Sequence, residues 1–88
     1  MKLVFSGQAW NDYLWWQAED AKGLDRVNVL LKEVMCDAFR GTGKPEPLGG
    51  NLSGWWSRRI NREHRLVYRV TGKGDEQALE VAQCRYHY

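Results

Sequence analysis

A glycine- and proline-rich segment divides this chain into two parts with different periodicity. Residues 41–51 contain four glycines and two prolines. Glycine leaves the backbone torsions unrestricted, and proline cannot donate a backbone hydrogen bond, so this composition is unfavourable inside a helix or a strand. We therefore expect an irregular loop here, with helices before it and strands after it.

Apolar residues before this loop follow helical spacing. Residues 2–5 are expected to form a short strand, and Ser6 is a suitable N-cap for a helix over about residues 7–20. Gly23 is expected to interrupt the helical region. A second amphipathic helix, ending before Gly41, is predicted by the i, i+3, i+7 spacing of Leu24, Val27, Leu30, Leu31, Val34 and Ala38.

The part after the loop is typical of antiparallel strands. Residues 55–60 and 64–70 are predicted to pair through a tight turn, and residues 78–86 to form the last strand. The order βααβββ predicts an α+β fold with two N-terminal helices packed on one face of a small, mainly antiparallel four-stranded sheet. At 88 residues, the whole chain (1–88) is expected to form a single domain.

Basic residues are concentrated in the middle of the chain. Residues 40–69 hold seven basic and two acidic side chains, whereas the parts before and after carry net negative charge. Six of the seven are arginines, whose guanidinium group matches phosphate in bidentate geometry. This distribution favours a polyanion-binding face over an ordinary solvated surface.

Alternation within residues 64–70 predicts which side chains meet the helices. Leu66, Tyr68 and Val70 occupy alternate positions, so they should face the helices. Arg65 and Arg69 should then stand on the open face of the sheet.

The turn between these strands predicts a second feature of the open face. If the turn closes with Ile60 opposite His64, then Arg59 falls directly opposite Arg65. Like charges in that arrangement are unfavourable, and an anion between them would turn the repulsion into a binding site. Two solvated arginines that splay apart are the alternative.

The spacing of potential ligands gives little support for metal chemistry. His64 and His87 are far apart in the sequence, and the chain has neither a His-x-x-x-His nor a Cys-x-x-Cys motif. A phosphate-binding loop is also disfavoured, because Pro45 stands where Ser or Thr should follow Lys44. We expect neither a metal ion nor another cofactor.

The apolar runs and the two cysteines predict the compartment and the state of the thiols. No apolar run approaches the ~20 residues of a membrane helix, so we expect a cytoplasmic protein without a membrane partner. Cys36 and Cys84 are then expected to stay reduced. A thiol nucleophile formed by Cys84 and His87 is less favoured than core packing, because strand alternation points the two side chains to opposite faces.

The remaining candidates form a set suited to RNA cleavage: Glu46, Arg59, Arg65, His87 and Tyr88. Attack of a 2′-hydroxyl on the neighbouring phosphorus needs a base, an acid and cations, and it needs no metal. Glu46 stands between two prolines that restrict the backbone, which fits either a positioned base or a surface charge.

Exposed aromatic side chains near the basic region are candidates for stacking on unpaired bases. These are Trp55, Trp56, Tyr86 and Tyr88. Core packing is the alternative for each of them, and we expect it for at least one of Trp55 and Trp56.

Four ordered motifs closely resemble those of the YoeB toxins, of the RelE-like superfamily of bacterial toxin–antitoxin systems. They are GKPEPL (43–48), NLSGWWSRRI (51–60), EHRLVY (63–68) and CRYHY (84–88). The likeness covers the chain with gaps only near 71–78. It implies a RelE-like, microbial RNase-like fold. It also implies a ribosome-dependent, metal-independent endoribonuclease that cuts mRNA in the A site and inhibits translation.

The resemblance also implies roles for individual residues. Glu46 corresponds to the general base, Arg65 to the residue that steadies the scissile phosphate, and His87 to the general acid. Further substrate and phosphate contacts are expected from Arg59, Tyr88, Lys44 and Arg85.

The implied partners are mRNA, the ribosome, a second copy of the chain in a homodimer, and a YefM-type antitoxin whose acidic C-terminal segment blocks the site. One departure is Gly49-Gly50, where family members commonly carry a basic residue. The alternatives are a non-catalytic RNA- or ribosome-binding module, a gyrase-poisoning relative and an inactive copy.

Overall fold

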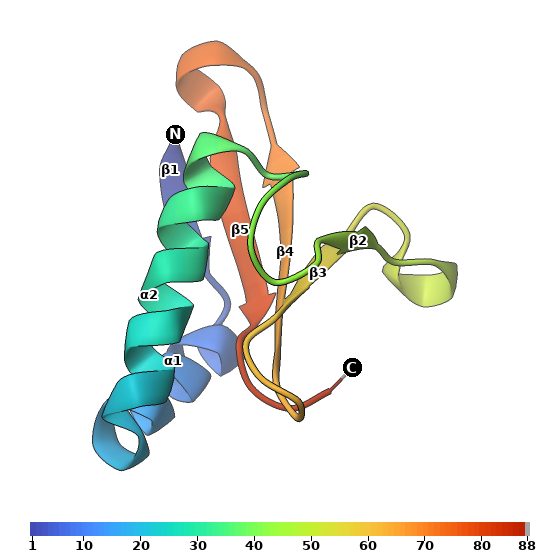
Figure 1. Cartoon of the computed structure of the whole chain (residues 1–88). Helices are drawn as coiled ribbons and strands as arrows, with labels where there is room; N and C mark the ends of the chain where they lie inside the picture. Colours follow the sequence, from blue (N-terminus) through green and yellow to red (C-terminus); the bar gives the residue numbers. More distant parts are fainter. Residues whose placement is uncertain (88) are drawn as a thin grey trace.

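The computed structural model of this chain describes residues 1–87 and is shown in Figure 1. Two helices follow an initial strand, and four further strands follow the helices. In chain order the elements are β1 (Lys2–Phe5), α1 (Gly7–Glu19), α2 (Ala21–Cys36), β2 (Glu46–Pro47), the 3₁₀ turn η1 (Gly50–Leu52), β3 (Trp56–Arg59), β4 (Arg65–Thr71), the 3₁₀ turn η2 (Gly74–Glu76) and β5 (Ala78–Gln83).

The strands form one mixed sheet in the order β1-β5-β4-β3-β2. β1 runs parallel to β5, and the other neighbours are antiparallel. Both helices lie on the same side of the sheet, so its other side is uncovered by helices (Figure 1). The predicted α+β architecture is confirmed. None of the helices within residues 1–87 is long and apolar enough to cross a membrane.

The predicted number of strands is wrong, because part of the glycine- and proline-rich segment joins the sheet. Glu46 pairs with Ser57 and Pro47 with Trp56, which makes β2 a fifth strand. Leu48 extends the contact by donating its backbone N–H to the carbonyl of Trp55 at 2.9 Å. Proline is compatible with a two-residue edge strand, because the backbone nitrogen that lacks an N–H can face solvent instead of a partner strand.

The last strand is also shorter than predicted. β5 ends at Gln83 and not at residue 86. The register between β4 and β5 shifts beside Val67 and Tyr68, and Tyr86 adopts a left-handed backbone with φ of 65°. Residues 84–87 therefore leave the sheet and pass the end of the β3–β4 hairpin (Figure 1).

The predicted break at Gly23 is wrong, because Gly23 lies within α2. α1 ends at Glu19, and Asp20 caps α2 by accepting a hydrogen bond from the N–H of Gly23 at 2.9 Å. A Cβ atom on Gly23 would lie 2.1 Å from the ring of Trp16, which is fully buried. Glycine at this position therefore lets the first turn of α2 pack directly on the tryptophan of α1.

The core lies between the helices and the sheet. Trp16 and Leu30 from the helices and Leu66, Tyr68 and Leu79 from the sheet are all fully buried in it. The alternate positions of β4 therefore face the helices as predicted. Their burial stabilises the fold by roughly 1.5–3 kcal/mol for each large apolar side chain.

One arginine of the basic region belongs to this core and not to the surface. Arg58 has no exposed surface. Its Nη2 donates to the carbonyls of Asp37 and Arg40, both at 2.6 Å, and its Nη1 donates to the carbonyl of Thr42 at 3.2 Å. These acceptors satisfy a cation that would otherwise be strongly disfavoured away from water. Arg58 therefore adds nothing to the polyanion-binding face predicted from sequence.

The same guanidinium is connected to two further side chains. Its Nε donates to the hydroxyl of Tyr68 at 3.2 Å, and that hydroxyl donates to the carbonyl of Ala38 at 2.6 Å. The carboxylate of Glu33 lies 3.7 Å from Nη1 of Arg58. The hydrogen bond from the Thr42 N–H is the main reason that the pKa of Glu33 is lowered, and the charge of Arg58 adds to it.

We predict that Arg58→Met lowers the free energy of unfolding by about 3–5 kcal/mol, because it leaves buried carbonyls and a charged network without a donor. The matched change Arg59→Met removes a neighbouring exposed charge, and its effect should stay within about 0.5 kcal/mol. Urea unfolding of both variants measures the difference. Equal midpoints for the two variants would contradict the structural role of Arg58.

Candidate active site

Strand pairing gathers three of the predicted site residues on the open face of the sheet. Arg59 lies directly opposite Arg65, and Ile60 donates its backbone N–H to the carbonyl of His64 at 3.0 Å. The predicted hairpin register is therefore confirmed. Glu46 pairs with Ser57, which shares its face with Arg59 because alternate residues of a strand point the same way.

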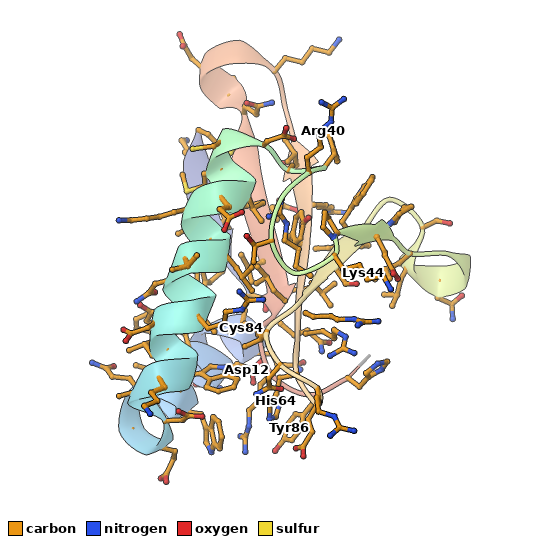
Figure 2. The ribbon with its side chains drawn as sticks, in the orientation of Figure 1. Asp12, Arg40, Lys44, His64, Cys84 and Tyr86 are labelled. Atoms are coloured by element: carbon orange, nitrogen blue, oxygen red, sulfur yellow. The ribbon has the colours of Figure 1, made fainter. Side chains whose placement is uncertain are left out.

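The loop before β2 is tied to β3 beside this face. The N–H of Arg59 donates to the carbonyl of Gly43 at 2.6 Å. Gly43 has a φ of 89°, and a Cβ atom there would lie 3.0 Å from the carbonyl oxygen of Arg59. Glycine is therefore favoured by both the torsion and the close contact. Lys44 follows with a φ of 55°, is exposed, and lies beside β2 (Figure 2).

The guanidinium of Arg65 is held in place by the turn that precedes it. Its Nη1 donates to the carbonyl of Asn61 at 2.8 Å and to that of His64 at 3.0 Å. Among the residues that the structure describes, no carboxylate forms an ion pair with Arg59 or Arg65. Both positive charges are therefore available to an anion on the open face.

The segment after β5 is fixed to the same end of the hairpin. The N–H of Arg65 donates to the carbonyl of Tyr86 at 3.0 Å, and the N–H of Tyr86 donates to Nδ1 of His64 at 2.7 Å. Figure 2 shows His64 and Tyr86 together at this end. His87 follows directly and is exposed. Tyr88, the other predicted site residue, lies outside the described residues.

His64 is a positioning residue that sequence reasoning missed. Its side chain is only 12% exposed, and its ring lies 5.1 Å from that of Trp16 and 6.0 Å from that of Trp15. Because Nδ1 accepts a hydrogen bond, the proton of the neutral ring lies on Nε2. The sequence places His64 at the start of a predicted strand and disfavours it as a metal ligand, but assigns no role to its ring. Nothing in a local pattern indicates that its ring would hold the backbone of Tyr86.

Arg85, predicted to contact phosphate, stacks on aromatic rings. Its guanidinium lies 3.7 Å from the ring centre of Trp15 and 4.4 Å from that of Tyr86. Such stacking is attractive because the ring faces carry negative potential. The residue is half-buried. Its predicted role at phosphate remains a prediction, and the stacking gives it a structural role as well.

The two neighbouring tryptophans occupy different environments. Trp56 packs against the core, and its ring lies 4.8 Å from that of Phe39. Core packing is thus confirmed for one of the pair, as expected. Trp55 lies on the open face with the guanidinium of Arg69 at 4.3 Å, and Arg69 pairs with Glu80 at 2.6 Å.

Cys84 is a core residue, as predicted. It is fully buried, its N–H donates to the carboxylate of Asp12 at 3.1 Å, and its carbonyl accepts from the indole of Trp16 at 2.6 Å (Figure 2). Burial, with a smaller effect of Asp12, raises the pKa of the Cys84 thiol to about 12. Burial also raises the pKa of Asp12, against the lowering effect of the hydrogen bond from Cys84. Both Cys84 and Cys36 are free thiols.

The arrangement can perform acid–base chemistry on an anion. It offers a carboxylate and two guanidinium groups that have no carboxylate partner among residues 1–87, all on one face, and an imidazole on a segment fixed at the end of that face. Within residues 1–87, no three His, Cys, Asp or Glu side chains are grouped closely enough to hold a metal ion.

Comparison with known proteins identifies relatives over the whole chain. Residues 5–88 match the family of YoeB-like toxins of bacterial type II toxin–antitoxin systems. The toxin YoeB of Escherichia coli is 52% identical over 88 residues, which cover 100% of both chains.

Solved structures show the same similarity. A YoeB/ParE toxin from Agrobacterium tumefaciens superposes with a TM-score of 0.97 at 53% identity, with both chains fully covered. YoeB of Staphylococcus aureus has been solved as a dimer and as a heterotetrameric complex with YefM. Both superpose with a TM-score of 0.86, at 45% and 46% identity, over 100% of this chain and 98% of that one.

We predict that only Cys36 reacts with a thiol reagent such as DTNB in the native protein near neutral pH. The raised pKa and burial of Cys84 remove both its thiolate and its access to the reagent. Denaturant should expose the second thiol, and Cys36→Ser should abolish native reactivity. Rapid native labelling of Cys84 would show that the thiol is accessible and would revive it as a candidate nucleophile.

Proposed function

The chain belongs to the YoeB-like toxins of bacterial type II toxin–antitoxin systems, and we propose that it is an endoribonuclease that cuts mRNA in the ribosomal A site. The observation that carries this proposal is the shared open face of Glu46, Arg59 and Arg65, with both arginines lacking a carboxylate partner among residues 1–87. A carboxylate beside uncompensated guanidinium groups suits a reaction at a phosphodiester.

In the proposed reaction, the carboxylate of Glu46 takes the proton of a 2′-hydroxyl. The 2′-oxygen then forms a bond to the adjacent phosphorus, and the bond from phosphorus to the 5′-oxygen breaks. The imidazolium of His87 gives its proton to the departing oxygen. The products are a 2′,3′-cyclic phosphate and a 5′-hydroxyl, so protons and bonds balance without a metal ion.

The arginines have an electrostatic role in this scheme. Negative charge builds up on the phosphate oxygens as the fifth oxygen approaches phosphorus, and Arg65 and Arg59 stabilise it. Three turn carbonyls hold the Arg65 guanidinium, so it needs little reorganisation during the reaction. Lys44, Arg85 and Tyr88 are proposed to bind and orient the RNA.

The partners that we propose follow from charge and from the relatives. A YefM-type antitoxin with an acidic segment would neutralise the same arginines and cover the site, as suits a family in which the Staphylococcus aureus member forms a heterotetramer with YefM. That member also forms a dimer, and we propose a homodimer for this chain. The ribosome is the third partner, because the proposed substrate is mRNA held in the A site.

Gly49 and Gly50 are proposed to weaken one contact of this interface. Both are exposed, at the place where the family resemblance predicts a basic side chain. Lys44, exposed in the preceding loop beside β2, is the proposed substitute cation. A non-catalytic module that binds RNA or the ribosome would need the arginines alone, so cleavage must decide between the two functions.

We predict that Glu46→Gln and His87→Gln each lower the rate of mRNA cleavage on translating ribosomes by about 10²–10⁴-fold, the usual contribution of a general acid or base. Primer extension on the recovered mRNA measures the rate. Glu76→Gln is the matched control. It changes an exposed carboxylate in η2, outside the candidate site, and should leave the rate unchanged.

Two further measurements complete this test. Wild-type cleavage should persist when a chelator selective for zinc and iron is added at constant magnesium, and both variants should keep the wild-type urea midpoint. Cleavage by Glu46→Gln and His87→Gln at the wild-type rate would rule out the proposed roles. Salt-sensitive ribosome binding by a wild-type protein that produces no cleavage would instead indicate a binding module.

A further inference from the structure

A basic pocket lies at the β3–β4 turn, next to the candidate active site. Its volume is about 460 Å³, and it is lined by Arg26, Arg59, Ile60, Asn61, Arg62 and Arg65. That volume falls within the range of roughly 300–1,000 Å³ typical of ligand sites. Four of the lining residues are arginines, and one of them comes from α2.

Two of these arginines are oriented by the turn itself. Arg26 donates from Nε to the carbonyl of Ile60 at 3.3 Å and from Nη2 to the carbonyl of Arg59 at 3.4 Å. Arg65 donates from Nη1 to the carbonyl of Asn61 at 2.8 Å. The acceptors are neutral main-chain groups, so these hydrogen bonds direct the guanidinium groups without cancelling their charge.

Among the residues that the structure describes, carboxylates do not neutralise the pocket. Within residues 1–87 the ion pairs involve Arg58, His64 and Arg69, and none involves a pocket arginine. Glu33 is close enough for Arg26 to lower its pKa slightly, but its main partner is the N–H of Thr42. Four like charges around one hollow repel one another, and a bound anion would relieve that repulsion.

We propose that this pocket holds an RNA backbone phosphate other than the one being cleaved, with Arg26 and Arg62 as contacts additional to the reaction site. The inference rests on the proposed function, since Arg59 and Arg65 border both places. Guanidinium groups bind phosphate oxygens in bidentate geometry, and several of them side by side suit a chain of phosphates. The phosphate belongs either to the mRNA or to ribosomal RNA.

The test compares Arg26→Gln, Arg62→Gln and the double variant with the control Lys32→Gln, which removes an exposed charge elsewhere on α2. The probe is a 2′-O-methylated RNA oligonucleotide, which cannot be cleaved because its 2′-oxygens are blocked. Fluorescence anisotropy over a series of salt concentrations gives the affinity and its salt dependence. Arg62→Gln is informative even if Arg26→Gln disturbs the turn, because the Arg62 side chain is exposed.

The double variant should bind the oligonucleotide about tenfold more weakly at low salt, in keeping with the loss of a charge-assisted contact. The slope of log affinity against log salt should become shallower by about 0.7 for one phosphate of a single strand. Lys32→Gln should leave both values unchanged. This result would assign the phosphate to the mRNA.

Binding of the same variants to ribosomes without mRNA, measured over the same salt concentrations, distinguishes an mRNA phosphate from a ribosomal RNA phosphate. A shallower salt slope there, with unchanged oligonucleotide binding, would assign the phosphate to ribosomal RNA and still support the pocket. Unchanged salt slopes in both assays would overturn the inference. It would also be overturned if the double variant bound an acidic antitoxin peptide more weakly but bound both RNA probes as the wild type does. Failure of the proposed function is a separate outcome, in which the wild type binds RNA through this pocket but cuts none.

Discussion

The buried guanidinium of Arg58 connects the parts of the chain on which the open face depends. It binds carbonyls of Asp37, Arg40 and Thr42, which lie between the end of α2 and the glycine-rich loop. The loop is thereby held over β3, where Gly43 accepts a hydrogen bond from the backbone of Arg59. β2 and its carboxylate follow four residues after Thr42, so their position depends on a cation that no solvent contacts.

Burial of Arg58 also determines what stands on the other side of the sheet. Alternate residues of β3 point to opposite faces, so Arg59 must face away from the helices. Pairing then brings it opposite Arg65, and this repulsion persists because neighbouring carbonyls, not carboxylates, hold the Arg65 side chain. Two adjacent arginines thus have opposite roles: Arg58 stabilises the fold, and Arg59 places on its surface a charge that no carboxylate within residues 1–87 pairs with.

Hydrogen bonds from the β3–β4 hairpin hold the C-terminal segment at this surface. β5 ends at Gln83, and the next residues turn past the hairpin. There the N–H of Tyr86 donates to Nδ1 of His64, and the carbonyl of Tyr86 accepts from the N–H of Arg65. The mostly buried imidazole of His64 therefore positions the segment that carries His87. The candidate site combines a loop, a hairpin and the segment after β5, and hydrogen bonds to main-chain groups hold each of them.

Periodicity and local chemistry in the sequence determined both helices, the hairpin register, the inward face of β4 and the family, because these depend on short-range spacing and contiguous motifs. Only the tertiary structure decided that Arg58 is buried while Arg59 is exposed, since both carry the same side chain. It alone showed that Gly23 makes room for Trp16 and that Arg26 reaches the β3–β4 turn. These outcomes depend on carbonyls and rings that come close only after the chain has folded.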